Sequence, residues 1–559
     1  YAIVESNHVD QFAVDYFCNG DAKLKAAMDT ILSDLHDAKE YGSILTVTPQ
    51  DWPALYDRFA EITEDINMSR EAAQRELLPL VQVAEALAQK YDVVVTNPPY
   101  MGSSGMSAKL SDFVKKNYSD SKNDLFAVFI ERCGQMAKKN GYQAMITQHA
   151  WMFLASFEKL RSKLLMVDIV NMVHLGARAF EEIGGEVVQT TLFVMRKSHI
   201  AEYKGKYCRL IEPTSQQGKE DMFLAGKCNY TAEQSDFSKI PGRPVAYWVS
   251  DAFYKIFETD NIGNCFDVKA GMCTGKNEDF IFQWEELDFT RSSLVTSNYL
   301  YTPHNKGGEF RKWYGNRDLF LKYNKKALSE MEHNAGFRHD GKEYYFRPHI
   351  GWSKIASSKP SFRYFEEGFT FDSAGLGLFS EHSNMKTTLA LLNSKMVEYL
   401  ISILNPTLNV TPMIVKRLPY TNVNIDEKVD ECIKLAKDDW DSFETSWDFQ
   451  KHPLLRKVST IAEAFEQWQT ECDNRFNQLK ANEEELNRIF IDIYGLQDEL
   501  TPEVEDKDVT VRKADLGRDI RSFISYAVGC MFGRYSIYKE GLIYAGGKWN
   551  YNDYENMAW

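Results

Sequence analysis

The sequence predicts an α/β protein in which a parallel sheet with crossover helices is followed by a mixed α/β region and a helical region. Three observations support this prediction. Short β-branched runs alternate with helical stretches between residues 91 and 200. Short aromatic, glycine-bearing and basic runs characterise residues 240–420. Residues 421–510 are acidic and carry apolar residues at helical spacing.

The length of 559 residues is too great for one hydrophobic core, so we expect several domains. The segments that we distinguish are residues 1–90, 91–200, 205–420, 421–510 and 511–559. The chain starts at Tyr1 without an initiator methionine or a signal-peptide pattern. We therefore expect a fragment of a longer protein, with a C-terminal segment that is cut short.

Composition restricts the classes of partner. The net charge of −15 disfavours non-specific coating of nucleic acid, although a local basic face could bind DNA. No apolar stretch is long enough to span a bilayer. The nine cysteines are scattered without a CxxC pair, which argues against zinc and for reduced thiols in a cytosol. We expect a cytoplasmic protein without membrane or metal partners.

Secondary structure can be assigned coarsely along the chain. Residues 1–90 predict helices, with Ser69 as a candidate N-cap and residues 44–47 as a strand or a loop. His149 and His174 lie in apolar strand contexts and are expected in the core. The expected strands are 93–96, 141–147, 169–175 and 187–195, and the later helices are 124–133, 156–165, 427–438 and 461–494, with Gly495 as a helix stop.

The motif Asn97-Pro98-Pro99-Tyr100 ends the first strand, because a proline cannot donate to a sheet ladder and fixes φ. The turn falls at the carboxyl end of a strand, where open α/β sheets bind ligands. There the Asn97 side-chain oxygen and the Pro98 carbonyl can accept both hydrogens of one planar NH2 group, beside the face of Tyr100. These bonds draw the nitrogen toward tetrahedral geometry and aim it at a methyl donor. The motif predicts a planar-amine methyltransferase, and a merely structural proline-stiffened loop is the alternative.

Cations are mixed with aromatic residues at 304–317 and 361–365, as contacts to phosphates and bases require. A solvated, irregular surface is the alternative for any single cation. The candidate DNA contacts are Lys306, Arg311, Lys312, Arg317, Lys354 and Arg363.

The motif at 97–100 resembles the catalytic motif of gamma-type N6-adenine DNA methyltransferases, which use S-adenosylmethionine. Asp124-Leu-Phe126 resembles the helix start that helps to wall the methyl-donor pocket, so the resemblance implies cofactor contacts for Asn97, Asp124 and Phe126. Phe180, with Thr190–Lys197 downstream, resembles the segment whose aromatic residue stacks on an extruded adenine. Tyr100 and Phe180 would then sandwich the base.

The runs Asn305–Gly315 and Phe523–Arg534 resemble the large adenine methyltransferases of bacterial BREX phage-defence systems, the PglX type. The resemblance covers most of the chain from about residue 90 onward. It implies a partial Rossmann-like methyltransferase sheet, with its catalytic half at 91–200, a target-recognition domain at 205–420 and a helical scaffold at 421–510. It further implies site-specific methylation of a flipped adenine in double-stranded DNA, in restriction–modification or phage defence, with other defence proteins as partners. Residues 1–90 lack the glycine-rich cofactor loop of that family. We expect a helical lead-in there, which could be the remainder of the cofactor-binding half.

Two alternatives remain open. The motif serves any planar amine, so the substrate could be a protein glutamine or an RNA base. The chain could also be a non-catalytic DNA-binding or specificity module left by truncation, which would bind DNA without S-adenosylmethionine.

Overall fold

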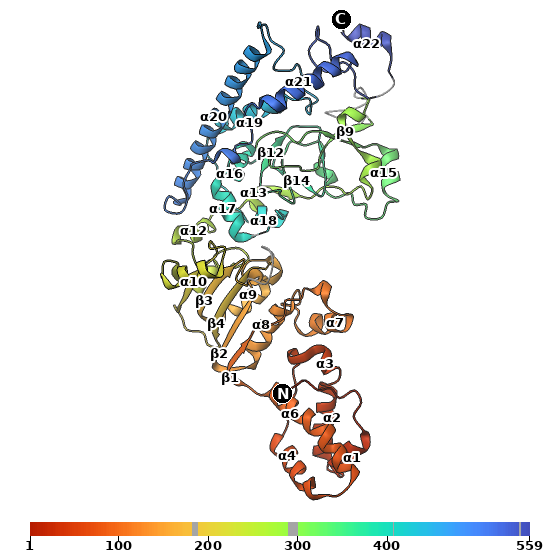
Figure 1. The fold of residues 1–559 in the computed structure, drawn as a ribbon, viewed down its shortest axis with the longest axis vertical. Coiled ribbons are helices and arrows are strands. Elements are labelled where there is room, and N and C mark those ends of the chain that lie inside the picture. The colour runs from red at the N-terminus through yellow and green to blue at the C-terminus, as the bar shows by residue number, and fades with distance from the viewer. Residues whose placement is uncertain (181–187, 289–299, 406, 547–548, 559) are drawn as a thin grey trace. The chain divides into compact units, whose positions relative to one another are not determined.

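The computed structural model describes residues 1–180, 188–288, 300–405, 407–546 and 549–558 (Figure 1). The chain divides into two compact units, Tyr1–Trp248 and Val249–Trp559. Both units contain helices and sheet, which confirms the predicted α/β class. None of the helices in the described part combines the length and apolar character that a membrane span needs.

The first unit begins with a helical region that has a core of its own. Phe17, Met28, Val81 and other apolar residues pack together in it without exposure. Asn67, rather than Ser69, caps α5 by accepting a hydrogen bond from the Arg70 N–H. Residues 44–47 are not a strand: Ile44 ends the 3-10 turn η1 (Gly42–Ile44), and residues 45–47 form a loop. The helices are α1 (Gln11–Cys18), α2 (Ala22–Asp34), α3 (Ala38–Tyr41), α4 (Trp52–Glu61), α5 (Met68–Ala72) and α6 (Leu78–Ala88).

A six-stranded sheet with the order β1-β2-β4-β3-β5-β6 forms the second half of this unit. β1 pairs with β2 and β3 pairs with β5 in parallel, whereas β4 is antiparallel to both β2 and β3. The sheet is therefore mixed rather than parallel. The strands are β1 (Tyr91–Thr96), β2 (Ala137–Gln148), β3 (Asp168–Gly176), β4 (Thr190–Arg196), β5 (Lys204–Arg209) and β6 (Asn229–Glu233). The sequence placed the start of β4 at residue 187, which lies outside the described residues.

Helices α8 (Leu125–Met136) and α9 (Glu158–Leu164) cover one face of the sheet, where Phe126 and Ile130 pack against Met172 and Phe193. On the other face Val93 and Val95 are 56% and 71% exposed. The β-branched run of the first strand is typical of a buried strand, but β1 is an edge strand with one open face. The sheet also continues through β5 and β6, so the first unit ends after Trp248 rather than near residue 205.

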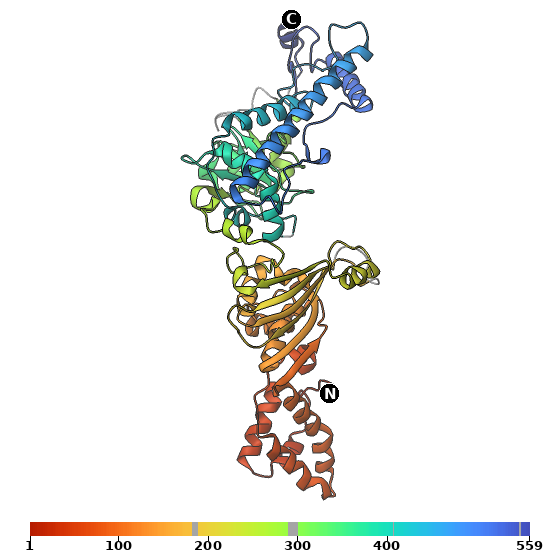
Figure 2. The same ribbon diagram turned by 90° about the vertical axis from the view of Figure 1, so that its left-hand side faces the viewer.

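The second unit contains two four-stranded sheets, with the orders β13-β9-β10-β8 and β12-β11-β14-β7. The long helix α20 (blue in Figure 2) is followed by Gly495. The φ of Gly495, 68°, provides the left-handed cap that the sequence predicted. The strands are β7 (Asp267–Lys269), β8 (Ile281–Gln283), β9 (Tyr301–Asn305), β10 (Leu319–Lys322), β11 (His349–Ser353), β12 (Phe362–Phe365), β13 (Thr370–Phe371) and β14 (Gly375–Phe379), and the main helices are α16 (Met385–Leu392), α17 (Lys395–Leu404), α19 (Asp426–Trp440), α20 (Ile461–Tyr494) and α21 (Leu516–Met531).

Candidate active site

The motif at residues 97–100 lies at the carboxyl end of β1, as the sequence predicted. β1, β2, β3 and β5 all run in one direction, so their carboxyl ends share one edge of the sheet. Asn97 is exposed at this edge, whereas Pro98 is buried and Tyr100 is partly buried. The Asn97 side chain is therefore accessible, and the rigid backbone at Pro98 is anchored beneath it.

The ring of Tyr100 is held edge-on against Phe126, with the ring centroids 6.2 Å apart and the planes at 85°. The Tyr100 hydroxyl is buried and has no hydrogen-bond partner among the described residues. Burial raises the pKa of Tyr100, so the phenol stays neutral at physiological pH. The motif thus carries a flat, uncharged aromatic ring three residues after Asn97.

Asp124 connects the motif to the start of α8. One carboxylate oxygen, Oδ1, accepts hydrogen bonds from the Phe126 N–H (3.3 Å) and the Met101 N–H (3.0 Å). The Leu125 N–H donates to the Met101 carbonyl at 3.0 Å. Burial raises the pKa of Asp124, and the backbone N–H donors oppose that rise. Asp124 therefore fixes the backbone that directly follows Tyr100.

Phe126 and Phe180, the two other aromatic residues of the expected site, differ in burial. Phe126 is fully buried in the core beneath Tyr100, so any cofactor contact from it would come through its backbone. Phe180 is partly buried and is the last described residue before the gap at 181–187. The stacking of Tyr100 and Phe180 on one base stays a prediction.

A histidine pair lies near the carboxyl ends of β2 and β3, and no local sequence signal pairs its members. His149 Nδ1 and His174 Nε2 are 2.8 Å apart, and both rings pack around Phe153. Burial lowers the pKa of His149 to about 4 and lowers the pKa of His174 well below its usual value. Both rings are neutral at physiological pH. His174 is a buried residue of β3, as the sequence predicted, whereas His149 begins the 3-10 turn η5 (His149–Met152) and is partly buried.

Four of the six candidate DNA-binding cations lie in the interior of the second unit. Arg311 is paired with Asp439, and Lys312 Nζ lies 3.0 Å from Glu483 Oε2. Arg363 is fully buried and donates to the Arg311 carbonyl at 3.0 Å. These side chains connect strands and loops to helices, so they are not free to contact DNA in this conformation.

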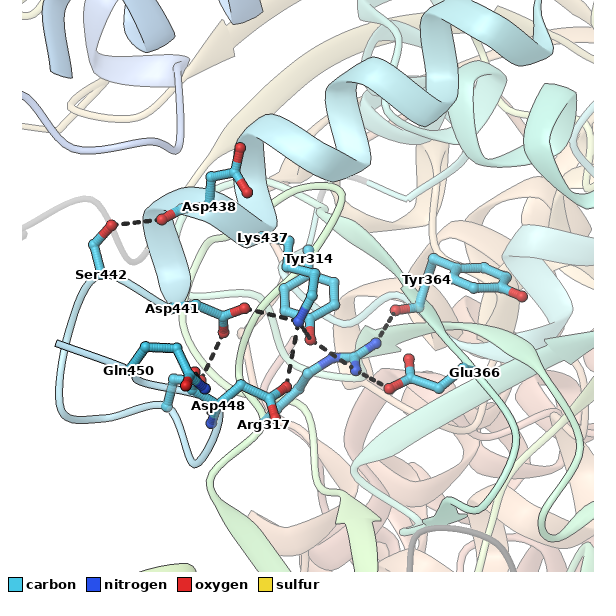
Figure 3. A network of polar contacts seen from close by, with 11 residues as sticks. Tyr314, Arg317, Tyr364, Glu366, Lys437, Asp438, Asp441, Ser442, Asp448 and Gln450 are labelled. Carbon is cyan, nitrogen blue, oxygen red and sulfur yellow. Dashed lines mark hydrogen bonds and ion pairs between the residues drawn. The ribbon is translucent and has the colours of Figure 1, made fainter. Parts of the chain in front are cut away.

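Arg317 is the fourth buried cation, and Figure 3 shows the polar network around it. Its guanidinium lies 3.8 Å from the centroid of the Tyr314 ring, pairs with Glu366 and donates to the Tyr364 carbonyl at 2.7 Å. Lys437 of α19 donates to the Tyr314 hydroxyl at 3.1 Å. The network ties the loop at 306–317 to α19.

Two candidate cations remain partly exposed. Lys306 Nζ lies 3.6 Å from Asp372 Oδ2 with its side chain partly accessible, and Lys354 is also partly accessible. Among the described residues, no group of His, Cys, Asp and Glu side chains is arranged to bind a metal ion. Lys306 and Lys354 are therefore the sequence-derived candidates that the structure leaves accessible to a polyanion.

Comparison with known proteins finds sequence similarity to methyltransferases. Residues 33–180 match the family model described as Eco57I restriction-modification methylase. The chain is 42% identical over 573 residues to the adenine-specific methyltransferase PglX of Lacticaseibacillus casei (strain Zhang), a match that covers 95% of the chain and 47% of that protein. It is 35% identical over 548 residues to the adenine-specific methyltransferase BrxX of Escherichia coli O9:H4 (strain HS), which covers 94% of the chain and 45% of that protein.

The chain thus spans about half the length of the curated relatives that it matches. Among solved structures, the Type IIL restriction-modification enzyme MmeI in complex with DNA is similar, with a TM-score of 0.47 and 11% sequence identity over 80% of the chain and 58% of MmeI. The family resemblance inferred from the sequence is confirmed. The chain is a relative of the PglX-type adenine-specific methyltransferases.

Proposed function

We propose that this chain is the catalytic and target-reading portion of a DNA adenine N6-methyltransferase that acts in bacterial phage defence. The observation that carries the proposal is the exposed Asn97 at the carboxyl end of β1, beside a Tyr100 ring fixed by Phe126. The similarity to PglX and BrxX over nearly the whole chain supports it. Double-stranded DNA is the proposed substrate, and other defence proteins in the cytoplasm are the proposed partners.

In this proposal the target adenine leaves the duplex and its ring stacks on Tyr100. The Asn97 side-chain oxygen and the Pro98 carbonyl accept the two hydrogens of the exocyclic amine. Both acceptors belong to a turn stiffened by two prolines, so they need little reorganisation as the nitrogen becomes tetrahedral. One proton of the amine then departs to solvent, and the adenine keeps the new N–CH3 bond.

S-adenosylmethionine, when bound, would supply the electrophilic methyl group: the amine nitrogen would form the N–C bond as the S–CH3 bond breaks and its electron pair stays on sulfur. Asn97 and the backbone at the start of α8, which Asp124 holds in place, fit the methyl-bearing end of this donor. The helical region before β1 contains no strand in the described residues, and its sequence lacks a glycine-rich loop.

The proposal is tested by methylation and DNA-binding assays on Asn97→Ala. We expect methylation to be lost and DNA affinity to be retained, because Asn97 acts on the amine and not on the DNA backbone. Asn171→Ala, an exposed asparagine on β3 of the same sheet, is the matched control and should behave as the wild type. Normal adenine methylation by Asn97→Ala would refute the assignment.

The same assay separates the two alternatives. Tritiated donor offered with DNA, RNA or a glutamine-bearing protein identifies the methyl acceptor, and transfer to RNA or protein would replace adenine as the substrate. Calorimetry with S-adenosylmethionine tests the alternative that the chain is a non-catalytic specificity module. Such a module would bind DNA but would release no heat when the donor is added.

A further inference from the structure

The segment that follows the catalytic motif is held at both of its ends. Near the motif, Met101 is bound to Asp124 and Leu125, as described above, and the Ser103 N–H donates to the Asn123 carbonyl at 3.0 Å. Farther along, the segment forms helix α7 (Ala108–Asn117). About half of residues 101–121 is therefore an anchored helix.

The far anchor comes from the helical region that precedes the motif, and α3 and α7 lie side by side (Figure 1). The ring of Tyr41, at the end of α3, stacks on Phe113 of α7 with centroids 4.3 Å apart and planes at 19°. Lys109 Nζ lies 3.0 Å from Asp37 Oδ2, but the lysine side chain is 66% exposed, so solvent weakens this ion pair. The ring stack is therefore the more important of these two contacts.

A small apolar core reinforces the stack. Ile44 of η1 is buried with Val114 of α7 and with Leu125 and Val128 in the first turns of α8. Tyr41 and Phe113 pack at the margin of this core. The helical region thus contacts α7 and also the start of the helix to which the motif is bound.

Gly42 produces the turn that presents Tyr41 on one side and Ile44 on the other. Its φ of 59° and ψ of −145° belong to a region that only glycine adopts readily. The backbone is thus shaped at this point to place two apolar side chains against α7 and α8.

We propose that Tyr41 is a positioning residue for methyl transfer. Tyr41 holds α7 in place through its contact with Phe113. The segment between Tyr100 and α7 then keeps Asn97 and Tyr100 in their reactive arrangement. The inference rests on the proposed methyltransferase function and extends it to a residue outside the catalytic half. Tyr41 itself does not reach the motif and acts only through Phe113 and the segment. Small displacements of reacting groups reduce rates by large factors, so a loosened segment should slow the chemical step.

The experiment measures the rate of single-turnover methylation per active site. It uses the purified protein in the complete form that its cell produces. We expect Tyr41→Ala to slow the transfer by about tenfold, a smaller loss than the roughly hundredfold that a displacement of about 1 Å causes. The dissociation constant for DNA should be unchanged. Tyr41→Phe keeps the stack and should restore the rate. Phe12→Ala removes an aromatic residue of the same helical region that is 80% exposed, and it should have no effect.

A second variant distinguishes loss of the ring stack from a general folding defect. Phe113→Leu removes the stack from the other side while it keeps an apolar side chain, so it should slow the transfer as Tyr41→Ala does. Hydrogen exchange of residues 101–117 should accelerate in both variants, while exchange in β2 and β4 should not.

Two outcomes would overturn the inference. One is a wild-type transfer rate in Tyr41→Ala, and the other is unchanged exchange over 101–117. A wild-type protein that transfers no methyl group to DNA would instead refute the proposed function, and the exchange measurement would still show whether Tyr41 holds the segment.

Discussion

Arg311 Nη2 and Asp439 Oδ2 are 2.5 Å apart in the interior of the second unit, although 128 residues separate them in the chain. Arg311 also lies over the Trp440 ring and donates to the Tyr314 carbonyl at 3.0 Å. Asp439 accepts a second hydrogen bond from the Arg512 N–H at 2.9 Å. One buried ion pair therefore joins the basic loop at 306–317, helix α19 and the segment before α21.

Arg311→Met should destabilise the second unit by about 3 kcal/mol, because it leaves the Asp439 carboxylate buried without its strongest partner. The midpoint of urea unfolding checks this expectation. Lys115→Met removes an exposed lysine whose Nζ lies 3.7 Å from Asp112, and it should leave the midpoint unchanged. Arg311→Met should also leave the salt dependence of DNA binding as it is. A reduced salt slope would show that Arg311 contacts phosphate after all.

Lys306→Ala should weaken binding to all DNA sequences alike, since Lys306 is a partly exposed cation of the kind that contacts phosphate. The logarithm of the DNA association constant decreases linearly with the logarithm of the salt concentration. The steepness of this decrease should become smaller by about 0.9 for each lost phosphate contact. Lys354→Ala should give the same result. An unchanged slope in both variants would exclude these two lysines from the DNA interface.

The His149–His174 pair should make the first unit sensitive to acid. In the unfolded chain histidines bind protons near their usual pKa of 6.5, whereas burial holds His149 unprotonated down to about pH 4. The unfolded state therefore binds more protons between these values, and stability is lost as pH falls from about 6.5 toward 4. Melting temperatures between pH 7.5 and 4.5 should fall less for the double variant His149→Gln/His174→Gln than for the wild type. Equal acid sensitivity would contradict the depressed pKa values.

Tyr100→Phe and Tyr100→Ala should differ sharply. The hydroxyl of Tyr100 is buried without a partner in the described structure, so its removal should preserve stability and methylation. Tyr100→Ala removes the ring on which the base would stack, and it should lower the methylation rate strongly. A large loss of rate in Tyr100→Phe would instead assign a role to the hydroxyl, such as a hydrogen bond to substrate or donor.

The local features of this protein were predictable because short-range chemistry specifies them. The motif at residues 97–100 has two prolines after a β-branched run, and those residues place a rigid turn at a strand end in any α/β sheet. Gly495 ends α20 because a left-handed cap favours glycine. The family resemblance could be read directly from these and similar residues.

The partners of individual side chains were not predictable, because they come from segments far apart in the chain. Four cations are of the type that contacts DNA, yet acidic side chains or carbonyls from other segments bind them inside the second unit. They are Arg311, Lys312, Arg317 and Arg363. The contact of Tyr41 with Phe113 likewise depends on how the helical region folds against α7. Residue identity specifies what a side chain can bind, whereas the packing of distant segments decides which partner reaches it.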